Sequence, residues 1–261
     1  MNNILKSLIC LVIISSCRNE ASLSIQSAKD YLLVTKDISS VVPVVVNASK
    51  DLVYLKTLFN KHGDSSNTCA TFRYINGDTS NMLGVIEFEI DFHQGCLDKD
   101  GLDKAGIIKC ELDNSLSIIN ACCKLEFDGF QITDDFIWGG MTIENKDENK
   151  WKVITEDFLL QSGKKSIVFV DTLLVEKIAG ITTYSFIDDE FMISSKGELN
   201  SNVLGYSHDL CKRYNCSWLT QGVLELNIDD HAKQIIDLGS NECDNEAILQ
   251  IGDEEYLLEM Q

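Results

Sequence analysis

Residues 86–92, with the sequence IEFEIDF, decide the fold because apolar and acidic side chains alternate strictly along them. A period of two places the isoleucine and phenylalanine side chains on one face of a strand and the carboxylates on the other. Turn residues such as Asp128-Gly129 and Ser162-Gly163 separate further strand-like runs, and such tight turns favour hairpins over helical crossovers. We therefore predict a mainly β fold of antiparallel hairpins and meanders. The further runs are residues 123–127, 137–143, 167–170, 182–187 and 224–228.

The chain before these strands has a different period. Apolar residues recur at helical spacing over residues 27–59, which predicts two helices separated near Pro43. The β-branched run at residues 41–46 leaves a strand open as the alternative. We expect a small helical N-terminal segment with a polar linker at residues 26–66, followed by an antiparallel β domain at residues 67–261.

The extreme N-terminus has the pattern of a lipoprotein signal peptide. A short apolar run at residues 8–14 follows Lys6 and ends in Ile14-Ser15-Ser16-Cys17, which fits a lipobox. The run is far shorter than the roughly 20 residues of a spanning helix. We predict a signal peptide at residues 1–16, lipidation of Cys17 and a polar tether at residues 17–25. The alternative is an ordinary signal peptide followed by a free cysteine.

These features predict where the protein is located in the cell and not what activity it has. Several acyl chains on Cys17 would hold the protein stably on membrane lipid. We expect an outer-membrane lipoprotein of the cell envelope, and the periplasmic and the surface-exposed side both stay open. With 22 basic and 41 acidic residues the net charge is −19, so the surface repels nucleic acid. High charge also keeps an exposed protein soluble, and this is the simpler interpretation.

The cysteines indicate a disulfide framework. Eight of the ten remain after Cys10 and Cys17 are set aside, an even set in a chain that we expect in an oxidising compartment. Two pairs have the same separation of 27 residues, and each second cysteine follows an apolar strand ending in Ile-Asp-apolar. We predict two related units, about residues 69–112 and 216–259. The predicted disulfides are Cys69–Cys96 and Cys216–Cys243.

The remaining thiols fit this framework less well. Cys110 and either Cys122 or Cys123 lie on successive predicted strands and are candidates for a bond across a hairpin. Cys211 then has no evident partner. Each predicted disulfide closes a loop of about 28 residues, which the chain-entropy model values at roughly 3 to 4 kcal/mol.

Three stretches carry a resemblance to a known family. They are Cys69 to Gly101, with its strand before Gly95-Cys96; Leu125 to Ile143, a hairpin ending in a Gly-Gly-Met-Thr strand; and Asn200 to Asn245, with its closing Cys-Asp-Asn. The chain resembles a family of uncharacterised surface lipoproteins of Bacteroidota. The resemblance implies a tethered β domain and no established activity. Departures are Leu238 in place of an aromatic residue, His93 in place of glycine, and the four extra cysteines.

No metal or cofactor site is predicted. The four histidines, His62, His93, His208 and His231, lack ligand spacing. Asp98, Asp100 and Asp103 surround Gly101, but the register of a calcium loop fails, so a solvated acidic turn is expected. A calcium-dependent adhesin stays as a third hypothesis.

Catalytic patterns are equally weak. The sequence has no Gly-x-Ser-x-Gly nucleophile elbow. The acidic pairs Asp134-Asp135, Asp188-Asp189-Glu190 and Asp229-Asp230 are expected to face solvent, although such carboxylates also serve glycosidases. Core packing is expected for the aromatic residues, and a sugar-stacking platform is the alternative. These aromatic residues are Trp138, Trp151, Trp218, Tyr184, Tyr206 and Phe191.

The leading hypothesis is a membrane-anchored, non-enzymatic binding or structural module without a cofactor, with a glycan or another envelope protein as candidate partner. The alternative is a glycan-binding accessory protein or a glycan-degrading enzyme that uses acidic and aromatic residues. An exposed groove with two carboxylates beside a tryptophan face would favour this alternative.

Overall fold

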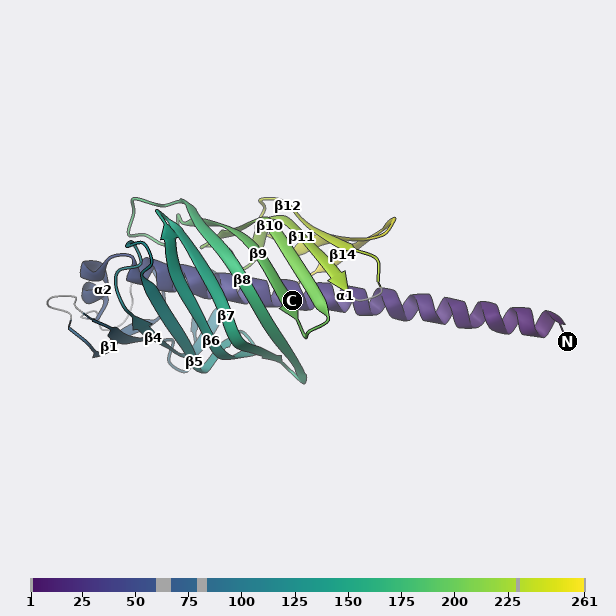
Figure 1. Cartoon of the computed structure of the whole chain (residues 1–261), viewed down its shortest axis with the longest axis horizontal. Helices are drawn as coiled ribbons and strands as arrows, with labels where there is room; N and C mark the ends of the chain where they lie inside the picture. The colour runs from purple at the N-terminus through teal and green to yellow at the C-terminus, as the bar shows by residue number, and fades with distance from the viewer. Residues whose placement is uncertain (1, 60–66, 79–83, 229–230, 261) are drawn as a thin grey trace.

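The protein is a single curled antiparallel sheet wound around a long helix (Figure 1). The structure, a computed structural model, describes residues 2–59, 67–78, 84–228 and 231–260, with side chains from Ser22 onward. The helices are α1 (Asn2–Ser49) and α2 (Leu52–Phe59). The strands are β1 (Thr71–Asn76), β2 (Ile86–Asp91), β3 (Cys96–Leu97), β4 (Asp103–Leu112), β5 (Cys122–Ile132), β6 (Asp135–Asp147), β7 (Lys150–Ser162), β8 (Lys165–Ala179), β9 (Glu190–Leu199), β10 (Val203–Arg213), β11 (Leu219–Ile228), β12 (Gln234–Ser240), β13 (Glu246–Ile251) and β14 (Glu254–Glu259).

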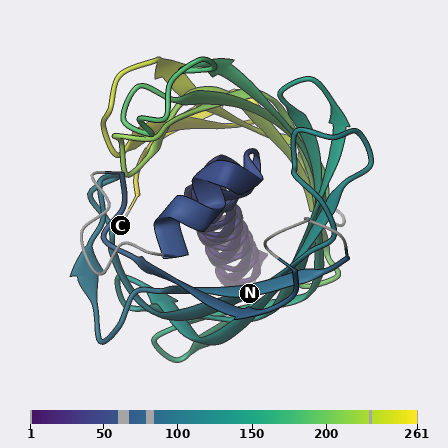
Figure 2. The ribbon, with the colours of Figure 1, turned by 90° about the vertical axis from the view of Figure 1, so that its left-hand side faces the viewer.

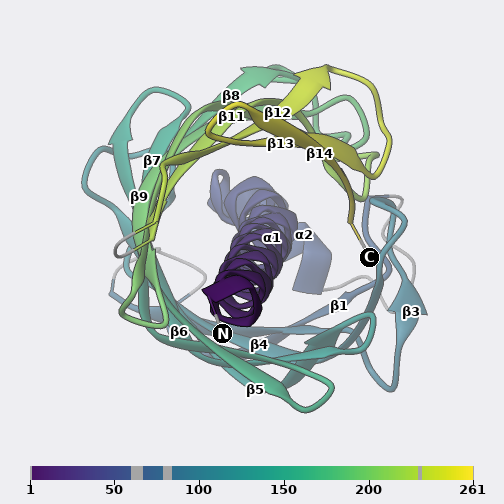
Figure 3. The ribbon, with the colours of Figure 1, turned by 90° about the vertical axis from the view of Figure 1, so that its right-hand side faces the viewer.

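The sheet is a meander in which strands pair with their neighbours along the chain. Its 14 strands run in the order β1-β2-β4 and then consecutively to β14, with β3 off this path beside β4. The predicted mainly antiparallel β fold is therefore confirmed. The strand at residues 86–91 alternates as expected, with Ile86, Phe88 and Ile90 buried. Viewed along α1, the strands surround the helix, and β1 and β14 form the two edges (Figures 2 and 3).

Helix α1 is the centre of the core rather than a separate N-terminal part. From Ser22 to Ser49 it is long and apolar enough to cross a membrane by length and composition, yet 94% of its most apolar window is buried inside the protein. Its first part projects beyond the sheet (Figure 1). Residues 17–25, predicted as a polar tether, continue the helix. Of the polar linker predicted at residues 61–67, the structure describes Asn67 alone, which is buried.

The predicted break near Pro43 is wrong, because α1 continues through Pro43 to Ser49. The run at residues 41–46 is buried throughout and helical, so the strand alternative is wrong as well. Burial on all sides by the sheet stabilises this helix despite its β-branched residues and its proline, since packing outweighs intrinsic propensity.

Helix α2 packs between α1 and the first strands. The Asp51 carboxylate caps it by accepting hydrogen bonds from the backbone N–H groups of Val53 and Tyr54, at 2.8 and 3.2 Å. The Phe59 ring lies 5.9 Å from that of Phe88, between ring centroids. On its other side, Tyr54 stacks on Tyr184 at 4.9 Å. Tyr184 belongs to residues 182–187, which were predicted as a strand but form a loop between β8 and β9.

Both predicted disulfides are present. The Cα atoms of Cys69 and Cys96 lie 6.1 Å apart, and those of Cys216 and Cys243 lie 5.8 Å apart. Each bond joins the residues just before one strand, β1 or β11, to the loop or short strand that follows the next strand, β2 or β12. The two units therefore share a topology at opposite ends of the meander. The candidate bond across the hairpin is absent, because Cys110, Cys122, Cys123 and Cys211 are all thiols.

Candidate functional site

Polar contacts between α1 and the inner face of the sheet are the most unusual feature of the molecule. The Tyr31 hydroxyl donates a hydrogen bond to the Asp171 carboxylate, 3.2 Å away, and both residues are buried. Burial raises the pKa of Asp171 to about 6. Two glycines on neighbouring strands make room for this pair, since a Cβ at Gly205 would collide with the Tyr31 ring and one at Gly197 with the Asp171 carboxylate.

A second contact lies near the C-terminal end of α1. The Lys177 ammonium lies 2.6 Å from one Asp189 oxygen, and the Asn47 amide donates a 2.5 Å hydrogen bond to the other. Lys177 also donates to Asn47, at 3.1 Å. Asp189 is 1% exposed, so the expectation that this acidic run faces solvent is wrong for Asp189. Burial, with the charge of Lys177 adding to it, lowers the pKa of neighbouring Lys50 to about 8.

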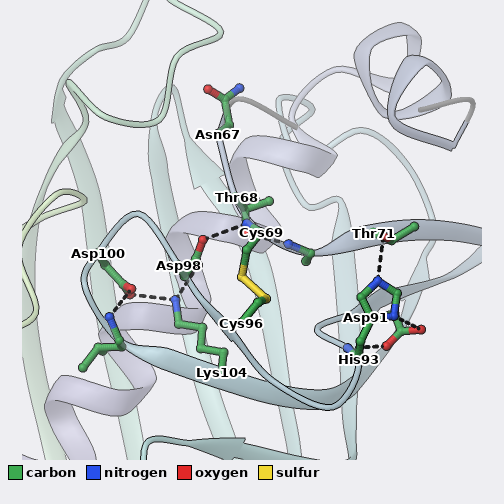
Figure 4. The surroundings of a disulfide bond; sticks show 12 residues. Asn67, Thr68, Cys69, Thr71, Asp91, His93, Cys96, Asp98, Asp100 and Lys104 are labelled. Atoms are coloured by element: carbon green, nitrogen blue, oxygen red, sulfur yellow. Dashed lines mark hydrogen bonds and ion pairs between the residues drawn. A yellow bond between two sulfur atoms is a disulfide. The ribbon is translucent and has the colours of Figure 1, made fainter. Parts of the chain in front are cut away.

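A third contact gathers charges beside the first disulfide (Figure 4). The Lys104 ammonium lies 2.8 Å from Asp98 and 2.6 Å from Asp100, and all three side chains are buried. Burial opposes the charge on Asp98, but the Lys104 ammonium outweighs it and holds the pKa of Asp98 below its usual value. The predicted solvated acidic turn is therefore wrong for Asp98 and Asp100, whose carboxylates face inward. Asp103 alone of the three is exposed.

This contact also joins the two ends of the sheet. The Ser217 hydroxyl, next to the second disulfide, donates a 2.8 Å hydrogen bond to the Asp100 carbonyl. Lys212 is fully buried nearby and donates to the Cys216 carbonyl. Burial lowers the pKa of Lys212 to about 8, although the Asp100 carboxylate opposes the shift.

Helix α1 adds Lys36 and Asp37 to these charges. Asp37 is 0% exposed, and its carboxylate lies 3.2 Å from the Lys36 ammonium. Burial raises the pKa of Asp37 to about 6; Lys36 opposes this shift, and the charge of Asp135 adds to it. We call the seven side chains the buried charge cluster: Lys36, Asp37, Asp98, Asp100, Lys104, Asp135 and Lys212. Three ammonium groups face four carboxylates, which leaves one negative charge unbalanced.

A groove of about 650 Å³ opens beside this cluster. Its floor is the segment of α1 from Gln26 to Lys36, and turns of the sheet form its walls. Asp135, at the start of β6, lines it and is only 8% exposed. Among the residues described, the Asp135 carboxylate has no hydrogen-bond or ion-pair partner. The other charged residues lining the groove are Lys29, Asp30, Lys36, Asp134 and Lys165, and Lys165 pairs with Asp30.

The groove brings together predicted residues that are far apart in sequence. Asp134, Asp135 and Trp218 all line it, and the Lys36 ammonium lies over the Trp218 ring, 5.1 Å from its centroid. Asp134 is exposed as expected, whereas Asp135 is not. Trp151 is core, as expected, and its indole N–H donates to the Leu116 carbonyl at 3.0 Å.

Other predicted residues lie elsewhere. Trp138 lies on the outer face, 44% exposed, which contradicts core packing. Phe191 is buried as expected, whereas Tyr184 is 54% exposed, which contradicts core packing for it as well. Tyr206 contacts Lys196 on the outer face, at 5.4 Å from ring centroid to ammonium. His62, Asp229 and Asp230 lie outside the described residues, as does the side chain of Cys17.

Sequence reasoning missed the lysines of the interior. In the sequence nothing distinguishes these lysines from solvent-exposed ones, because the neighbouring residues do not show whether a polar side chain meets a carboxylate or water. They are Lys36, Lys104, Lys177 and Lys212. His93 remains a surface residue, with its ring 2.9 Å from the Thr71 hydroxyl. Over the described part of the chain, no group of three His, Cys, Asp or Glu side chains is arranged to hold a metal ion. The chain matches no family model, no curated protein and no solved structure.

Proposed function

We propose that this protein is a membrane-tethered, non-enzymatic binding protein of the cell envelope, and that the groove beside the buried charge cluster is its binding site. One observation carries the proposal: Asp135 is nine-tenths buried, lines the groove and has no partner among the described residues. A mostly buried carboxylate that keeps only part of its hydration gains from a charged or hydrogen-bonding partner. A ligand group at Asp135 would supply that partner.

The predicted anchor supports a site near the membrane. Helix α1 runs without a break from the lipobox into the groove, so Gln26 lies nine residues beyond Cys17. At 1.5 Å per residue, this helical segment spans about 14 Å. A lipidated Cys17 would hold the groove close to the head groups of the membrane.

The anchor is tested by replacing its cysteine. Wild-type chain expressed in a bacterium with a lipoprotein pathway is expected in the membrane fraction, with acyl mass on Cys17. Cys17→Ser should move it to the soluble fraction of the envelope. The matched control is Cys10→Ser, which alters the same predicted signal peptide without touching the lipobox. Membrane retention of Cys17→Ser without acyl mass would contradict the anchor.

The binding site is tested by filling the groove. Native mass spectrometry of the full chain in detergent, after incubation with an envelope extract, is expected to show bound small-molecule adducts. Gln26→Trp, at an exposed helical position that lines the groove, should remove them. Leu23→Trp, on the same helix and 53% exposed but outside the groove, should keep them. Adducts that persist in Gln26→Trp would place binding elsewhere.

Glycan binding is the second candidate, because Asp134, Asp135 and Trp218 share the groove. Carboxylates beside an indole suit sugar hydroxyls and ring faces. Titration with envelope oligosaccharides, monitored by tryptophan fluorescence in a Trp138→Phe background, tests this candidate, because of the two remaining tryptophans Trp218 lines the groove and Trp151 is buried in the core. Saturable quenching would support it, and an unchanged spectrum would count against it.

A further inference from the structure

Asp135 is the one carboxylate of the buried charge cluster that has no cation as an ion-pair partner among the described residues. The cluster holds one carboxylate more than it holds ammonium groups, and each lysine in it already contacts another member or a nearby backbone carbonyl. Lys104 lies within 2.8 Å of both Asp98 and Asp100, Lys36 lies 3.2 Å from Asp37, and Lys212 donates to the Cys216 carbonyl. Asp135 is left facing the groove without a cation.

We infer that the groove binds its ligand through a primary ammonium group placed at Asp135, an inference that rests on the proposed function. The ammonium group supplies both the positive charge that the cluster lacks and N–H donors for the Asp135 oxygens. A hydrogen bond between ionised groups is shorter and stronger than one between neutral groups.

The neighbours of Asp135 exclude other cations. A divalent metal ion needs several oxygen ligands. Asp30 and Asp134 also line the groove, but Asp30 pairs with Lys165, and no three acidic, histidine or cysteine side chains of the described residues are arranged to hold a metal ion. A quaternary ammonium group has no N–H to donate and depends on open aromatic faces. The aromatic side chain lining the groove is Trp218, and Lys36 already covers its ring at 5.1 Å.

The other residues that line the groove indicate the chemistry of the rest of the ligand. Leu33, Leu102 and Met260 line the groove with apolar surface, which suits a short alkyl chain beside the ammonium group. Lys29 lines it too, without a partner among the described residues, and offers a contact for an anion. Two sources share this chemistry: a soluble alkylamine, and the ethanolamine head group of a membrane phospholipid.

The experiment compares amines on the full chain in non-ionic detergent. Isothermal titration with 1,4-diaminobutane tests the soluble source, with tetramethylammonium as the quaternary control. Native mass spectrometry with lysophosphatidylethanolamine tests the lipid source, with lysophosphatidylcholine as its control. We expect at least one primary amine to bind and to exceed its quaternary control by at least about 10-fold in affinity.

Two variants assign the effect to one side chain. Asp135→Asn should weaken binding of the primary amine by at least about 10-fold. Asp134→Asn, the exposed neighbour in the same groove, should change it by less than about 3-fold. The melting temperature of Asp135→Asn should stay close to that of the wild type, because the amide has the shape of the carboxylate and no described side chain pairs with Asp135. Lost binding is therefore separable from lost folding.

The outcomes are distinct. Binding of diaminobutane alone assigns a soluble amine, and preference for the ethanolamine lipid assigns a head group. The inference is overturned if neither amine binds or if Asp135→Asn binds as tightly as the wild type. If envelope adducts are still lost in Gln26→Trp in that case, the groove remains the binding site and the ammonium assignment alone has failed.

Discussion

At the scale of single residues, Asp171 shows how burial raises the pKa of a carboxyl group in this protein. Its side chain is 2% exposed, its Oδ2 accepts from Tyr31, and its Oδ1 has no partner among the described residues. Among the described residues, no lysine side chain forms an ion pair with it, whereas Lys104 pairs with Asp98. The protein therefore holds an ionised Asp171 at neutral pH only at a cost in stability.

The pH dependence of this cost has a definite sign. The pKa of Asp171 rises from 3.8 to about 6 on folding, so its contribution to stability is present below pH 4 and is lost as the pH rises to about 6. Asp171→Asn should flatten that part of the stability profile and raise the free energy of unfolding at pH 7.5 by roughly 1–3 kcal/mol. Urea denaturation across pH 4–7.5 checks it.

Asp157→Asn is the matched control for this prediction. Asp157 is exposed and has a positive φ of 51°, which asparagine also adopts readily. The free energy of unfolding of Asp157→Asn should depend on pH in the same way as that of the wild type. A profile of Asp171→Asn that falls as steeply between pH 4 and 6 as that of the wild type would assign the dependence to other groups.

At the scale of elements, the Tyr31–Asp171 contact between α1 and the sheet depends on two residues without side chains, one on β9 and one on β10. The Tyr31 ring occupies the space that a Cβ of Gly205 would fill, and Asp171 occupies that of Gly197. Neither position needs a glycine for its backbone angles, since neither has a positive φ. The requirement is therefore one of space, between helix and sheet at Gly205 and between β8 and β9 at Gly197.

Gly205→Ala is expected to lower the free energy of unfolding by roughly 1–3 kcal/mol, because an overpacked core forces the helix or the strand to shift. Thermal denaturation of the full chain measures it. Combining it with Tyr31→Leu should cost less than the sum of the two single changes, since a smaller side chain frees space at Gly205. Strict additivity would show that the ring and the glycine are not in contact.

Bulges explain why the sequence pattern did not predict several of the long strands. In β7 the register shifts between Ile154 and Phe158, and in β10 it shifts between Ser207 and Leu210. Asp157 and Asp209 lie inside these shifts with positive φ values of 51° and 53°. A bulge inverts the inside and outside positions along the strand, so the period of two is lost over the full length.

At the scale of the whole molecule, the two disulfide units meet across the open part of the sheet. Ser217 of the second unit contacts Asp100 of the first, and the buried charge cluster joins the first unit to α1, β6 and β10. The groove is thus made by the closing of the meander. Neither unit alone contains it.

Each disulfide is expected to stabilise the fold through the chain that it closes. Replacing Cys216 and Cys243 together by serine should lower the free energy of unfolding by about 3 to 4 kcal/mol, for a separation of 27 residues. Guanidinium denaturation of the full chain in detergent measures the loss. Cys122→Ser, at a half-buried thiol in β5, is the control and should change it by about 0.5 kcal/mol or less. An unchanged midpoint in the double variant would show that this bond does not constrain the unfolded chain.

The sequence by itself determined the antiparallel strands and the two disulfide pairs. Alternation at residues 86–92, tight turns such as Asp128-Gly129 and the equal cysteine spacing are local signals, and a strand or a short loop responds to its own residues. Helical spacing likewise predicted α1, although not its passage through Pro43.

Only the tertiary structure decided where α1 lies and which charges are buried. A polar residue on a helix or in a turn looks the same whether it meets water or a distant partner. Lys104 and Asp98 pair inside the protein, and Tyr31 meets Asp171, 140 residues away. The free energy that buries such charges comes from groups far apart in the chain, and therefore no local pattern in the sequence records it.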